Sequence, residues 1–308
     1  MEVLVYGAGA LGSLVGGLLA RTHEVTLVGR DPHMRQVRED GLRIDGEVDV
    51  HVRPRAVTDG THRSADLAVV TTKAYDTDAA ARALATGEYD AVCSLQNGFT
   101  EERLDAALDS TVFAGTASYG ARFVEPGRVA CTGIGEVVVG PLSGGTDPLA
   151  ERVGSAFAEA GIETTVAADM PRRRYEKLAV NAGINGPSAL ARLSNGATLD
   201  GPGGETAREA AREVARVARA DGIGLGGDEA VAAVERVAAD TAANRSSMCE
   251  DVAAGRRTEV DAIYGAAIDR ADRFGVSAPT CRTLASLIRG WEAGAGIRPT
   301  DAADAGAE

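Results

Sequence analysis

Hydrophobic runs and turn residues alternate with helical patterns along the first half of the chain. Short apolar strands are predicted at residues 3–6, 24–28, 66–72, 91–95, 112–117, 129–132, 136–139 and 162–166. Helices are predicted at residues 13–20 and near 34–39, and Asp45-Gly46 marks a hairpin turn. Strands separated by helical stretches are typical of a mostly parallel sheet covered by helices. Residues 1–168 are therefore predicted to form an α/β domain of the Rossmann type, with a doubly wound parallel sheet.

The pattern changes after about residue 168. Alternation with a period of two nearly disappears between Pro171 and Trp291, and stretches rich in Ala, Arg and Glu take over. Helices are predicted at residues 205–220, 228–242 and 260–274. Residues 169–291 are thus expected to form a smaller all-helical domain. Residues 292–308, which are rich in Gly, Ala and Asp, are expected to form a flexible tail.

The chain of 308 residues carries a formal net charge of −13, so a nucleic acid or an anionic membrane is not an expected partner. Of its 32 basic side chains, only Lys73 and Lys177 are lysines. An acidic surface with few lysines suggests adaptation to high salt, where repulsion between charges is screened. No apolar run is long enough for a membrane span and no signal peptide is expected. We therefore predict a cytoplasmic protein, either a monomer or a homodimer.

The placement of cysteine and histidine narrows the chemistry. The four cysteines lie far apart without a C-x-x-C pair, which is typical of reduced thiols in a cytosolic protein. All four histidines lie within the first 62 residues, so no metal site is expected, and the second domain must use other titratable groups.

A glycine motif, Gly7-Ala-Gly9-Ala10-Leu11-Gly12, follows the first predicted strand and opens a helix. Gly7 permits a tight turn, Gly9 allows close approach to a pyrophosphate, and Gly12 allows close packing of helix and strand. The N–H groups of Ala10, Leu11 and Gly12 would then face the phosphates at the helix N-terminus. This context predicts a dinucleotide site, whereas the motif alone would fit a glycine-rich turn without a ligand.

The end of the second strand selects between NADP and NAD. Arg30 is suited to a 2′-phosphate, whereas Asp31 is suited to a free ribose hydroxyl or to capping the helix that starts near Pro32. Arg30 lies nearer the strand, so NADPH is predicted and NADH remains possible. Lys73 and Asn97 end later strands and are placed to face the cofactor; a surface lysine and a plain Asn-Gly turn are the alternatives.

The second domain opens with a polar row. Lys177, Asn181 and Asn185 are spaced by four residues, which lines them along one helical face before Pro187 stops or kinks the helix. Amides can orient the carbonyl, carboxylate and hydroxyl groups of a ligand, and an ammonium can donate a proton. The alternative is a solvated polar stripe. Asn195-Gly196 adds a further amide in a turn.

Two segments further on resemble helix capping boxes. Ser247 begins Ser-Met-Cys-Glu250, and Thr258 precedes Glu259-Val-Asp261. Ser247 and Thr258 are therefore predicted N-caps, and Glu259 would complement the helix dipole unless a ligand uses it.

Together these motifs resemble, in order and spacing, those of the ketopantoate reductases (2-dehydropantoate 2-reductases) over residues 1–291. The motifs are Gly7–Gly12, Thr72-Lys73-Ala74, Gln96-Asn97-Gly98, Lys177–Asn185, Asn195-Gly196, Ser246-Ser247-Met248 and Thr258–Asp261. The resemblance implies NADPH and a 2-oxo acid in a cleft between a Rossmann domain and a helical domain. It also implies a role in pantothenate and coenzyme A biosynthesis.

The resemblance gives each residue a role. Lys177 would be the general acid that protonates the ketone oxygen. Asn97, Asn181, Asn185, Asn195 and Ser247 would hold the substrate, and Glu259 would accept a hydrogen bond from its terminal hydroxyl and lie near the cofactor. Arg30 and Lys73 would bind the 2′-phosphate side of the cofactor. The alternatives are a reductase of the same fold for another 2-oxo acid or an imine, and an NADP-binding redox sensor without turnover.

Overall fold

The computed structural model describes residues 1–298, and the chain divides into two compact units. Unit 1 spans Met1–Pro171, and unit 2 begins at Arg172. Of the segment predicted to be a flexible tail, residues 292–294 lie in a helix, whereas residues 299–308 lie outside the described residues. No helix within residues 1–298 has both the length and the apolar character needed to cross a bilayer.

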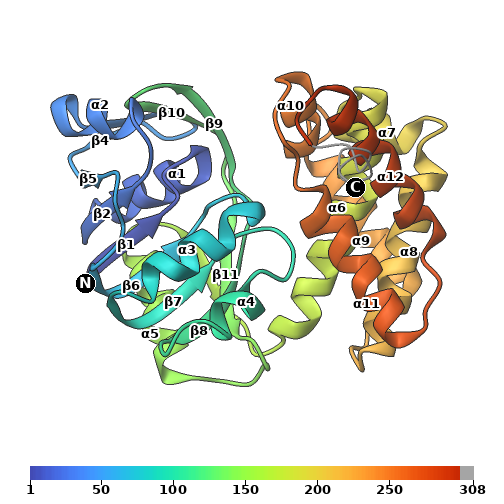
Figure 1. Cartoon of the computed structure of the whole chain (residues 1–308), viewed down its shortest axis with the longest axis horizontal. Coiled ribbons are helices and arrows are strands. Elements are labelled where there is room, and N and C mark those ends of the chain that lie inside the picture. Colours follow the sequence, from blue (N-terminus) through green and yellow to red (C-terminus); the bar gives the residue numbers. More distant parts are fainter. Residues whose placement is uncertain (299–308) are drawn as a thin grey trace, which may run out of the picture. The chain divides into compact units, whose positions relative to one another are not determined.

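Unit 1 is built on an eight-stranded sheet in the order β12-β11-β8-β7-β6-β1-β2-β5 (Figure 1). Its strands are, in chain order, β1 (Glu2–Tyr6), β2 (Glu24–Val28), β5 (Arg55–Val57), β6 (Ser64–Val70), β7 (Glu88–Ser94), β8 (Thr111–Ala117), β11 (Glu136–Pro141) and β12 (Glu163–Val166). The neighbouring strands pair in parallel, except for β8 and β11, which are antiparallel. The predicted Rossmann-type fold is confirmed, while β5 had no recognisable signal in the sequence.

Helices cover both faces of this sheet, which is why its central strands are continuously apolar. In β1, Val3 and Val5 enter one core and Leu4 enters the core on the opposite face. The helices of unit 1 are α1 (Ala10–Leu19), α2 (His33–Asp40), the 3₁₀ turn η1 (Ala74–Asp76), α3 (Thr77–Leu84), α4 (Glu101–Asp105) and α5 (Pro148–Glu159). Helix α1 contacts β1 and β2 on one side and a second sheet on the other.

That second sheet was not predicted. It has four strands in the order β4-β3-β10-β9, namely β4 (Val50–Val52), β3 (Leu42–Gly46), β10 (Arg128–Gly133) and β9 (Gly120–Glu125). Strands β3 and β4 form the predicted hairpin, but Gly46 still belongs to β3 and the turn follows it. Strand β9 escaped prediction because its last four residues are all exposed and show no alternation of buried and exposed positions.

Unit 2 is helical throughout its described residues. After α6 (Met170–Ala191), which begins at the end of unit 1, come α7 (Asn195–Asp200), α8 (Gly204–Ala220), α9 (Gly227–Asp240), α10 (Ser247–Ala253), the π-helical turn η2 (Asp261–Gly265), α11 (Ala266–Phe274) and α12 (Pro279–Gly294). The three predicted helices are present, as α8, α9 and the pair η2–α11. Pro187 does not end its helix, because α6 continues to Ala191.

Helix α8 is the centre of this unit, with contacts to α7, α9, α11 and α12. Its buried positions, among them Ala207, Ala211, Val214 and Ala218, recur every three or four residues along one face. Glu213 is fully buried and accepts hydrogen bonds from the N–H groups of Thr280 and Cys281, at 2.7 and 2.8 Å. A carboxylate of α8 thus satisfies the otherwise unpaired N-terminus of α12.

Candidate functional site

The loops that follow β1, β6 and β7 lie along one edge of the eight-stranded sheet. Strand β6 pairs in parallel with both β1 and β7, so the carboxyl ends of the three strands are neighbours. Strand order reverses between β1 and β6, since β2 lies on one side of β1 and β6 on the other. In open α/β sheets this reversal is where ligands bind. Gly7, Lys73 and Asn97 all follow these strands, so the structure brings these predicted cofactor residues to one edge.

The glycine loop after β1 has a backbone conformation that excludes side chains at two positions. Gly7 has a φ of +112°, and a Cβ there would lie 2.5 Å from the backbone nitrogen of Thr72. A Cβ at Gly12 would lie 2.3 Å from the Gly7 carbonyl oxygen. That carbonyl accepts hydrogen bonds from the Gly9 N–H and the Thr71 hydroxyl, at 2.6 and 3.0 Å. The loop is therefore fixed by its own glycines and by the loop after β6.

Gly9 differs from its two neighbours in the motif. A Cβ at this position would have only the Gly7 carbonyl nearby, at 3.9 Å. Packing within unit 1 therefore does not require glycine here, but a ligand that approaches the backbone would. Helix α1 begins directly after Gly9 with no side-chain cap and no acidic residue in its first turn. The N–H groups of Ala10, Leu11 and Gly12 point out of this N-terminus, so the loop fits the pyrophosphate of a dinucleotide.

Arg30 and Asp31 play different roles at the end of β2. The Arg30 side chain is 89% exposed and pairs with Asp76 of η1 at 3.0 Å. The Asp31 carboxylate accepts the N–H of Arg35 at 2.9 Å and pairs with Arg38 at 3.2 Å. Asp31 is thus engaged by the first turns of α2, although the N-cap is Pro32 and not Asp31, one residue later than the alternative interpretation placed it. Arg30 presents its guanidinium group to solvent.

A residue that the sequence prediction missed fixes the loops that carry Lys73 and Asn97. Gln96 is buried, and its side-chain amide donates to the carbonyl and hydroxyl oxygens of Thr72, at 3.0 and 2.9 Å, and to the Thr77 hydroxyl at 3.0 Å. The loop after β7 is therefore tied to the loop after β6. Its place beside Asn97 in the Gln-Asn-Gly segment was the only signal that sequence offered.

In unit 2, helix α6 carries the polar row. Lys177 and Asn181 are half-buried, and Asn185 is 6% exposed. The row therefore passes from the accessible part of the helix into the interior of the unit, unlike a stripe on a solvated surface. Tyr175, two residues before Lys177, is buried and donates its hydroxyl to Asp221 at 2.5 Å.

Asn195 contains a buried polar atom with an unsatisfied hydrogen-bonding capacity. The residue is 7% exposed, and its amide nitrogen donates to the Thr241 hydroxyl at 2.9 Å. Its Oδ1 is buried and accepts no hydrogen bond from any residue of the described chain. Because an unsatisfied buried amide oxygen is costly, this atom needs a donor from a bound water or from a ligand.

The predicted capping role of Ser247 is wrong by one residue. Ser246 is the N-cap of α10 and accepts the Cys249 N–H at 3.1 Å. Its hydroxyl also lies 2.6 Å from that of Ser188, which donates to the Asn185 carbonyl at 3.1 Å. Ser246 therefore links α10 to the end of the polar row. Ser247 is exposed and does not serve as the cap, so its substrate role rests on the resemblance alone.

Glu259 is 6% exposed and lies in a segment fixed by the buried carboxylate of Glu292 and by partly exposed ion pairs of Asp261. The Thr258 N–H and hydroxyl both donate to Glu292, each at 2.7 Å, and the hydroxyl accepts the Val260 N–H at 3.2 Å. The predicted N-cap role of Thr258 is wrong, because Val260 is the N-cap of η2 and the Thr258 bonds lie in the loop before it. Asp261 pairs with Arg289 at 2.8 Å. Burial opposes ionisation of Asp261, but the hydrogen bonds from Arg298 and Arg289 hold the pKa of its carboxyl below the usual value.

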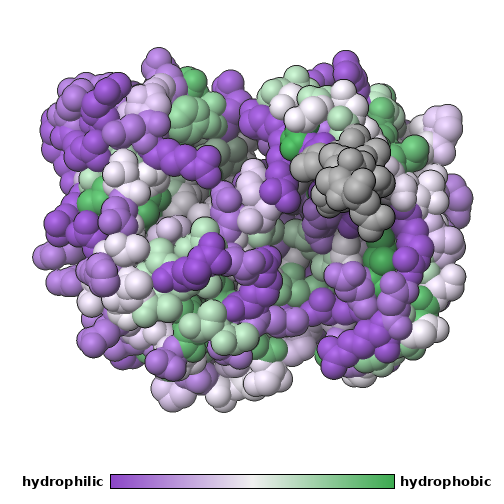
Figure 2. Space-filling view, in the orientation of Figure 1, coloured by the Kyte–Doolittle hydropathy of each residue, from purple (hydrophilic) through white to green (hydrophobic). Residues whose placement is uncertain are grey.

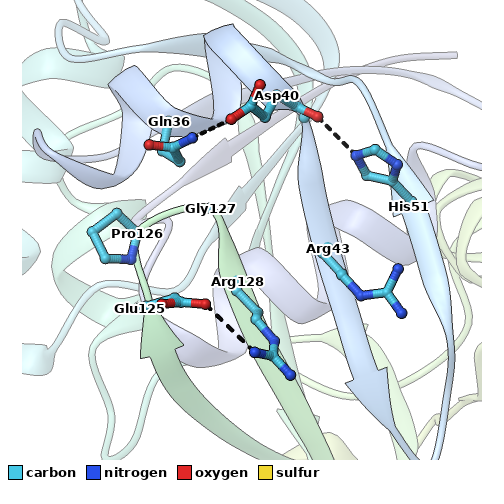
Figure 3. A pocket seen from close by; sticks show the side chains of 9 residues that line it. Gln36, Asp40, Arg43, His51, Glu125, Pro126, Gly127 and Arg128 are labelled. Atoms are coloured by element: carbon cyan, nitrogen blue, oxygen red, sulfur yellow. Dashed lines mark hydrogen bonds and ion pairs between the residues drawn. The ribbon is translucent and has the colours of Figure 1, made fainter.

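A hollow of about 540 Å³ on the small sheet of unit 1 is a different kind of feature (Figure 3). Hydrophilic side chains gather over this corner of unit 1, around α2 and β4 (Figure 2). The hollow is lined by Gln36, Asp40, Gly41, Arg43, His51, Glu125, Pro126, Gly127 and Arg128. Its arginines already pair with carboxylates, Arg43 with Asp49 at 3.1 Å and Arg128 with Asp45 at 2.6 Å. None of the predicted site residues lines it, so we assign it no ligand.

No group of three His, Cys, Asp or Glu residues within residues 1–298 is arranged to hold a metal ion. The thiols of all four cysteines are buried and unpaired with one another. Burial raises the pKa of the Cys93 thiol to about 12, so this cysteine is not a nucleophile at neutral pH. The glycine loop of unit 1 and the polar row of unit 2 therefore remain the candidate sites for binding and catalysis.

Comparison with known families gives two matches that together span most of the chain. Residues 3–144 match the model described as ketopantoate reductase PanE/ApbA. Residues 169–292 match the model described as ketopantoate reductase PanE/ApbA C terminal.

Relatives and solved structures agree with these matches. The 2-dehydropantoate 2-reductase of Halobacterium salinarum is 44% identical over 94% of this chain and 98% of its own length, and that of Archaeoglobus fulgidus is 36% identical over 95% and 98%. The crystal structure of a PanE/ApbA family ketopantoate reductase from Ralstonia eutropha is 32% identical, with a TM-score of 0.87 over 96% of this chain and all of that one. A D-mandelate dehydrogenase, solved with NADH and anilino(oxo)acetate, shares the fold at 24% identity, with a TM-score of 0.89 over 97% of this chain and all of that one.

Proposed function

The chain belongs to the ketopantoate reductase family, and we propose that it reduces 2-dehydropantoate to pantoate with a reduced nicotinamide cofactor. The observation that carries this proposal lies in unit 2. There a lysine and two amides share one helix, α6, with Asn195, Ser247 and Glu259 in the same unit. The same reaction would supply pantoate for pantothenate and coenzyme A biosynthesis.

The glycine loop of unit 1 supports the cofactor half of the proposal. When bound, the reduced nicotinamide supplies the hydride that reduces the C2 carbonyl. Gly7 and Gly12 shape the loop, and the N–H groups of Ala10, Leu11 and Gly12 would bind the pyrophosphate. Gln96 ties the loops that carry Lys73 and Asn97 to each other.

Lys177 is the residue to which we assign the proton. Hydride addition leaves negative charge on the former carbonyl oxygen, and an ammonium group both stabilises that charge and protonates it to a hydroxyl. A lysine in water has a pKa of about 10.4, so at neutral pH its ammonium group carries the proton that a general acid must give. Solvent then restores the proton to Lys177. No histidine competes for this role in unit 2, because the last histidine of the chain is His62.

The amides and Glu259 are assigned to orientation and selectivity. Asn97, Asn181 and Asn185 would hold the carboxylate and carbonyl of the 2-oxo acid, since amides can donate to both groups. Asn195, Ser247 and Glu259 would contact its distal end, where 2-dehydropantoate carries a hydroxyl group. The substrate hydroxyl could donate a hydrogen bond to the buried carboxylate of Glu259. The buried Oδ1 of Asn195, which accepts no hydrogen bond from the described chain, could accept one in the same way.

For the cofactor we propose NADPH over NADH. Arg30 is exposed and cationic, whereas the competing carboxylate, Asp31, is occupied by Arg35 and Arg38. A 2′-phosphate would displace Asp76 from the Arg30 guanidinium, and Lys73 would add a second positive charge.

The second candidate is a reductase of the same fold for another 2-oxo acid. The D-mandelate dehydrogenase has the same fold, and its structure holds NADH and anilino(oxo)acetate. A redox sensor without turnover is disfavoured, because such a protein has no use for Lys177 and its amide row.

One comparison of substrates tests the assignment. NADPH oxidation is measured with 2-dehydropantoate, 2-oxoisovalerate and pyruvate in high-salt buffer. The last two lack the terminal hydroxyl, so their kcat/KM should be lower by about 100-fold or more, since a site built to bond a hydroxyl leaves polar groups unpaired without it. Glu259→Gln is the matched variant, and it should reduce the ratio of kcat/KM for 2-dehydropantoate to kcat/KM for the other two acids. Equal kcat/KM values for the three acids in the wild type would remove 2-dehydropantoate as the substrate.

We also propose that the chain works in high salt. Its net charge of −13 and its thirty arginines against two lysines carry this proposal, and many of the arginines form exposed ion pairs. Unfolding temperatures should rise between low and multimolar KCl. An unchanged unfolding temperature would contradict it.

A further inference from the structure

The hydroxyl of Tyr264 enters a turn of helix α6. Tyr264 is fully buried in the π-helical turn η2, and its hydroxyl donates to the Ala182 carbonyl at 2.6 Å. The same oxygen accepts the Gly186 N–H at 2.9 Å. In a regular α-helix, the N–H of residue 186 bonds to the carbonyl of residue 182. The tyrosine hydroxyl therefore bridges the two groups that close this turn.

The next position of the α6 ladder is interrupted as well. Pro187 lies inside the helix and has no N–H, so the carbonyl of Gly183 loses its usual helical donor. Two consecutive hydrogen-bonding positions, 186 to 182 and 187 to 183, are thus altered where Asn185 lies. Side chains that enter a helical ladder, like prolines within it, change the local winding of the helix.

Local winding decides where Asn185 points. Residues four apart in a regular helix are rotated by about 40° from one another, so Asn185 would stand about 80° around the axis from Lys177. A change in winding at this turn would increase or offset this drift. The turn bridged by Tyr264 begins one residue after Asn181 and ends one residue after Asn185, so its shape sets the direction of the last amide in the row.

Filling space does not explain the hydroxyl, because phenylalanine would fill the same volume without burying a polar group. The opposite side of the contact is equally specific. A Cβ at Gly186 would lie 2.2 Å from the Tyr264 hydroxyl, so this position admits only glycine while the hydroxyl is in place. Tyr264 also lies five residues after Glu259, so it connects the segment of that carboxylate to the amide row.

We propose that Tyr264 is a positioning residue for substrate binding. Its hydroxyl holds the Ala182–Gly186 turn of α6 in the conformation that directs the Asn185 amide to the 2-oxo acid. This inference rests on the proposed function of the row and adds a residue that does not touch the substrate.

The test is the kinetics of Tyr264→Phe with 2-dehydropantoate and NADPH. We expect KM for the 2-oxo acid to rise by about tenfold, while kcat falls by no more than about threefold, because binding geometry changes and the proton donor does not. KM for NADPH should stay within about twofold, since the glycine loop lies in unit 1.

Two further variants separate positioning from general destabilisation. Tyr175→Phe removes another buried hydroxyl of the same unit, the one bonded to Asp221, and should lower the unfolding temperature without raising KM for the 2-oxo acid. In an Asn185→Ala background, Tyr264→Phe should add little to KM, because the amide through which it acts is already absent. If Tyr264→Phe fails to fold, Gly186→Ala displaces the hydroxyl from the other side and should give the same rise in KM.

The outcomes are distinct. A lower unfolding temperature for Tyr264→Phe with an unchanged KM for the 2-oxo acid would overturn the proposal, as would equal effects of this substitution with and without Asn185. Failure of the proposed function shows differently, as a wild type that does not select 2-dehydropantoate. The ratio of variant to wild-type KM is then measured with whichever 2-oxo acid the wild type reduces best.

Discussion

The proposed sites in the two units of this chain are built from different groups. Unit 1 uses backbone: the glycine loop and the N-terminus of α1 present N–H groups, and the loop is closed by hydrogen bonds among Gly7, Gly9 and Thr71. Unit 2 uses side chains: Lys177 and the asparagines project from helices that pack through Ala and Val. A backbone site depends on the absence of side chains, and a side-chain site depends on how each helix is held.

This difference predicts how each site fails. A substitution in unit 1 should act by adding atoms where the chain leaves none, and one in unit 2 by removing a functional group. The four predictions below use this contrast, beginning with the largest expected effect.

Lys177→Ala should reduce kcat by about 100-fold or more, which is the scale of general acid catalysis by a positioned side chain. NADPH affinity, measured by fluorescence titration, should remain close to that of the wild type, because the cofactor loop belongs to the other unit. Lys177→Arg is the matched control: it keeps the positive charge but cannot release a proton, so it should be almost as inactive. Near-normal turnover of either variant would remove Lys177 from the role of proton donor.

Gly9→Ala and Gly12→Ala should separate ligand binding from folding. A Cβ at Gly9 has room in unit 1, so this variant should keep its unfolding temperature but bind NADPH about tenfold more weakly or worse, a loss of roughly 1.4 kcal/mol. A Cβ at Gly12 meets the Gly7 carbonyl at 2.3 Å, so this variant should also lose about 1–3 kcal/mol of unfolding free energy. Calorimetry with and without NADPH measures both quantities. Unchanged NADPH affinity in Gly9→Ala would show that no phosphate lies against this loop.

The same contrast explains what sequence could predict. The glycine loop is contiguous and follows a strand, so a local pattern was enough to find it. The spacing of Lys177, Asn181 and Asn185 also follows from helical geometry, which is local. Tyr264 and Gly186 are 78 positions apart, and no pattern in the sequence around either residue predicts their contact. The one-residue error at Ser246 and Ser247 arose because both can cap a helix, and only the partner Ser188 distinguishes them.

Strands without a regular pattern of buried and exposed positions could not be predicted from the sequence either. Strand β9 is exposed along its second half, and β5 has three residues, too few to show alternation. The four-stranded sheet to which β9 belongs combines segments more than 70 residues apart, such as β3 and β10. Its hydrogen bonds form between distant parts of the chain, so the strand propensity of a short segment does not predict them.

Arg30→Ala asks which cofactor unit 1 prefers. NADPH should bind about tenfold more weakly, because a charged hydrogen bond to the 2′-phosphate is lost, whereas NADH should be almost unaffected. Asp31→Asn is the control variant. The Asp31 carboxylate pairs with Arg38 within the unit, so this substitution should change the affinity for neither cofactor much. Equal losses for the two cofactors in Arg30→Ala would assign this arginine to the adenosine in general and leave NADH as an equal candidate.

The smallest expected effect is a pH dependence confined to unit 1. His33 is buried, its Nδ1 accepts the Gly127 N–H at 2.9 Å, and its Nε2 lies 2.9 Å from the Ser13 hydroxyl, to which it donates. Burial lowers the pKa of His33, because the charged ring would lose water and face the Gly127 N–H with a second N–H. A lowered pKa in the folded state means that the unfolded state takes up the proton first. Stability is therefore full above the ordinary histidine pKa of about 6.5 and is lost as the pH falls through the lower, folded value.

His33→Gln tests this linkage, because a glutamine can accept from Gly127 and donate to Ser13 without titrating. Between pH 7.5 and 5, the wild type should lose a few degrees of unfolding temperature and His33→Gln should lose less. Hydrogen exchange resolved by segment should place the difference in α1, α2 and the β9–β10 turn. Unit 2 has no histidine, so its exchange rates, corrected for intrinsic pH effects, should be the same in the two proteins over this range. A protonation effect that appeared equally in both units would mean that the stabilities of the two units are coupled. The contrast between a site made of backbone groups and a site made of side chains would then hold for the two sites but not for the folding of the two units.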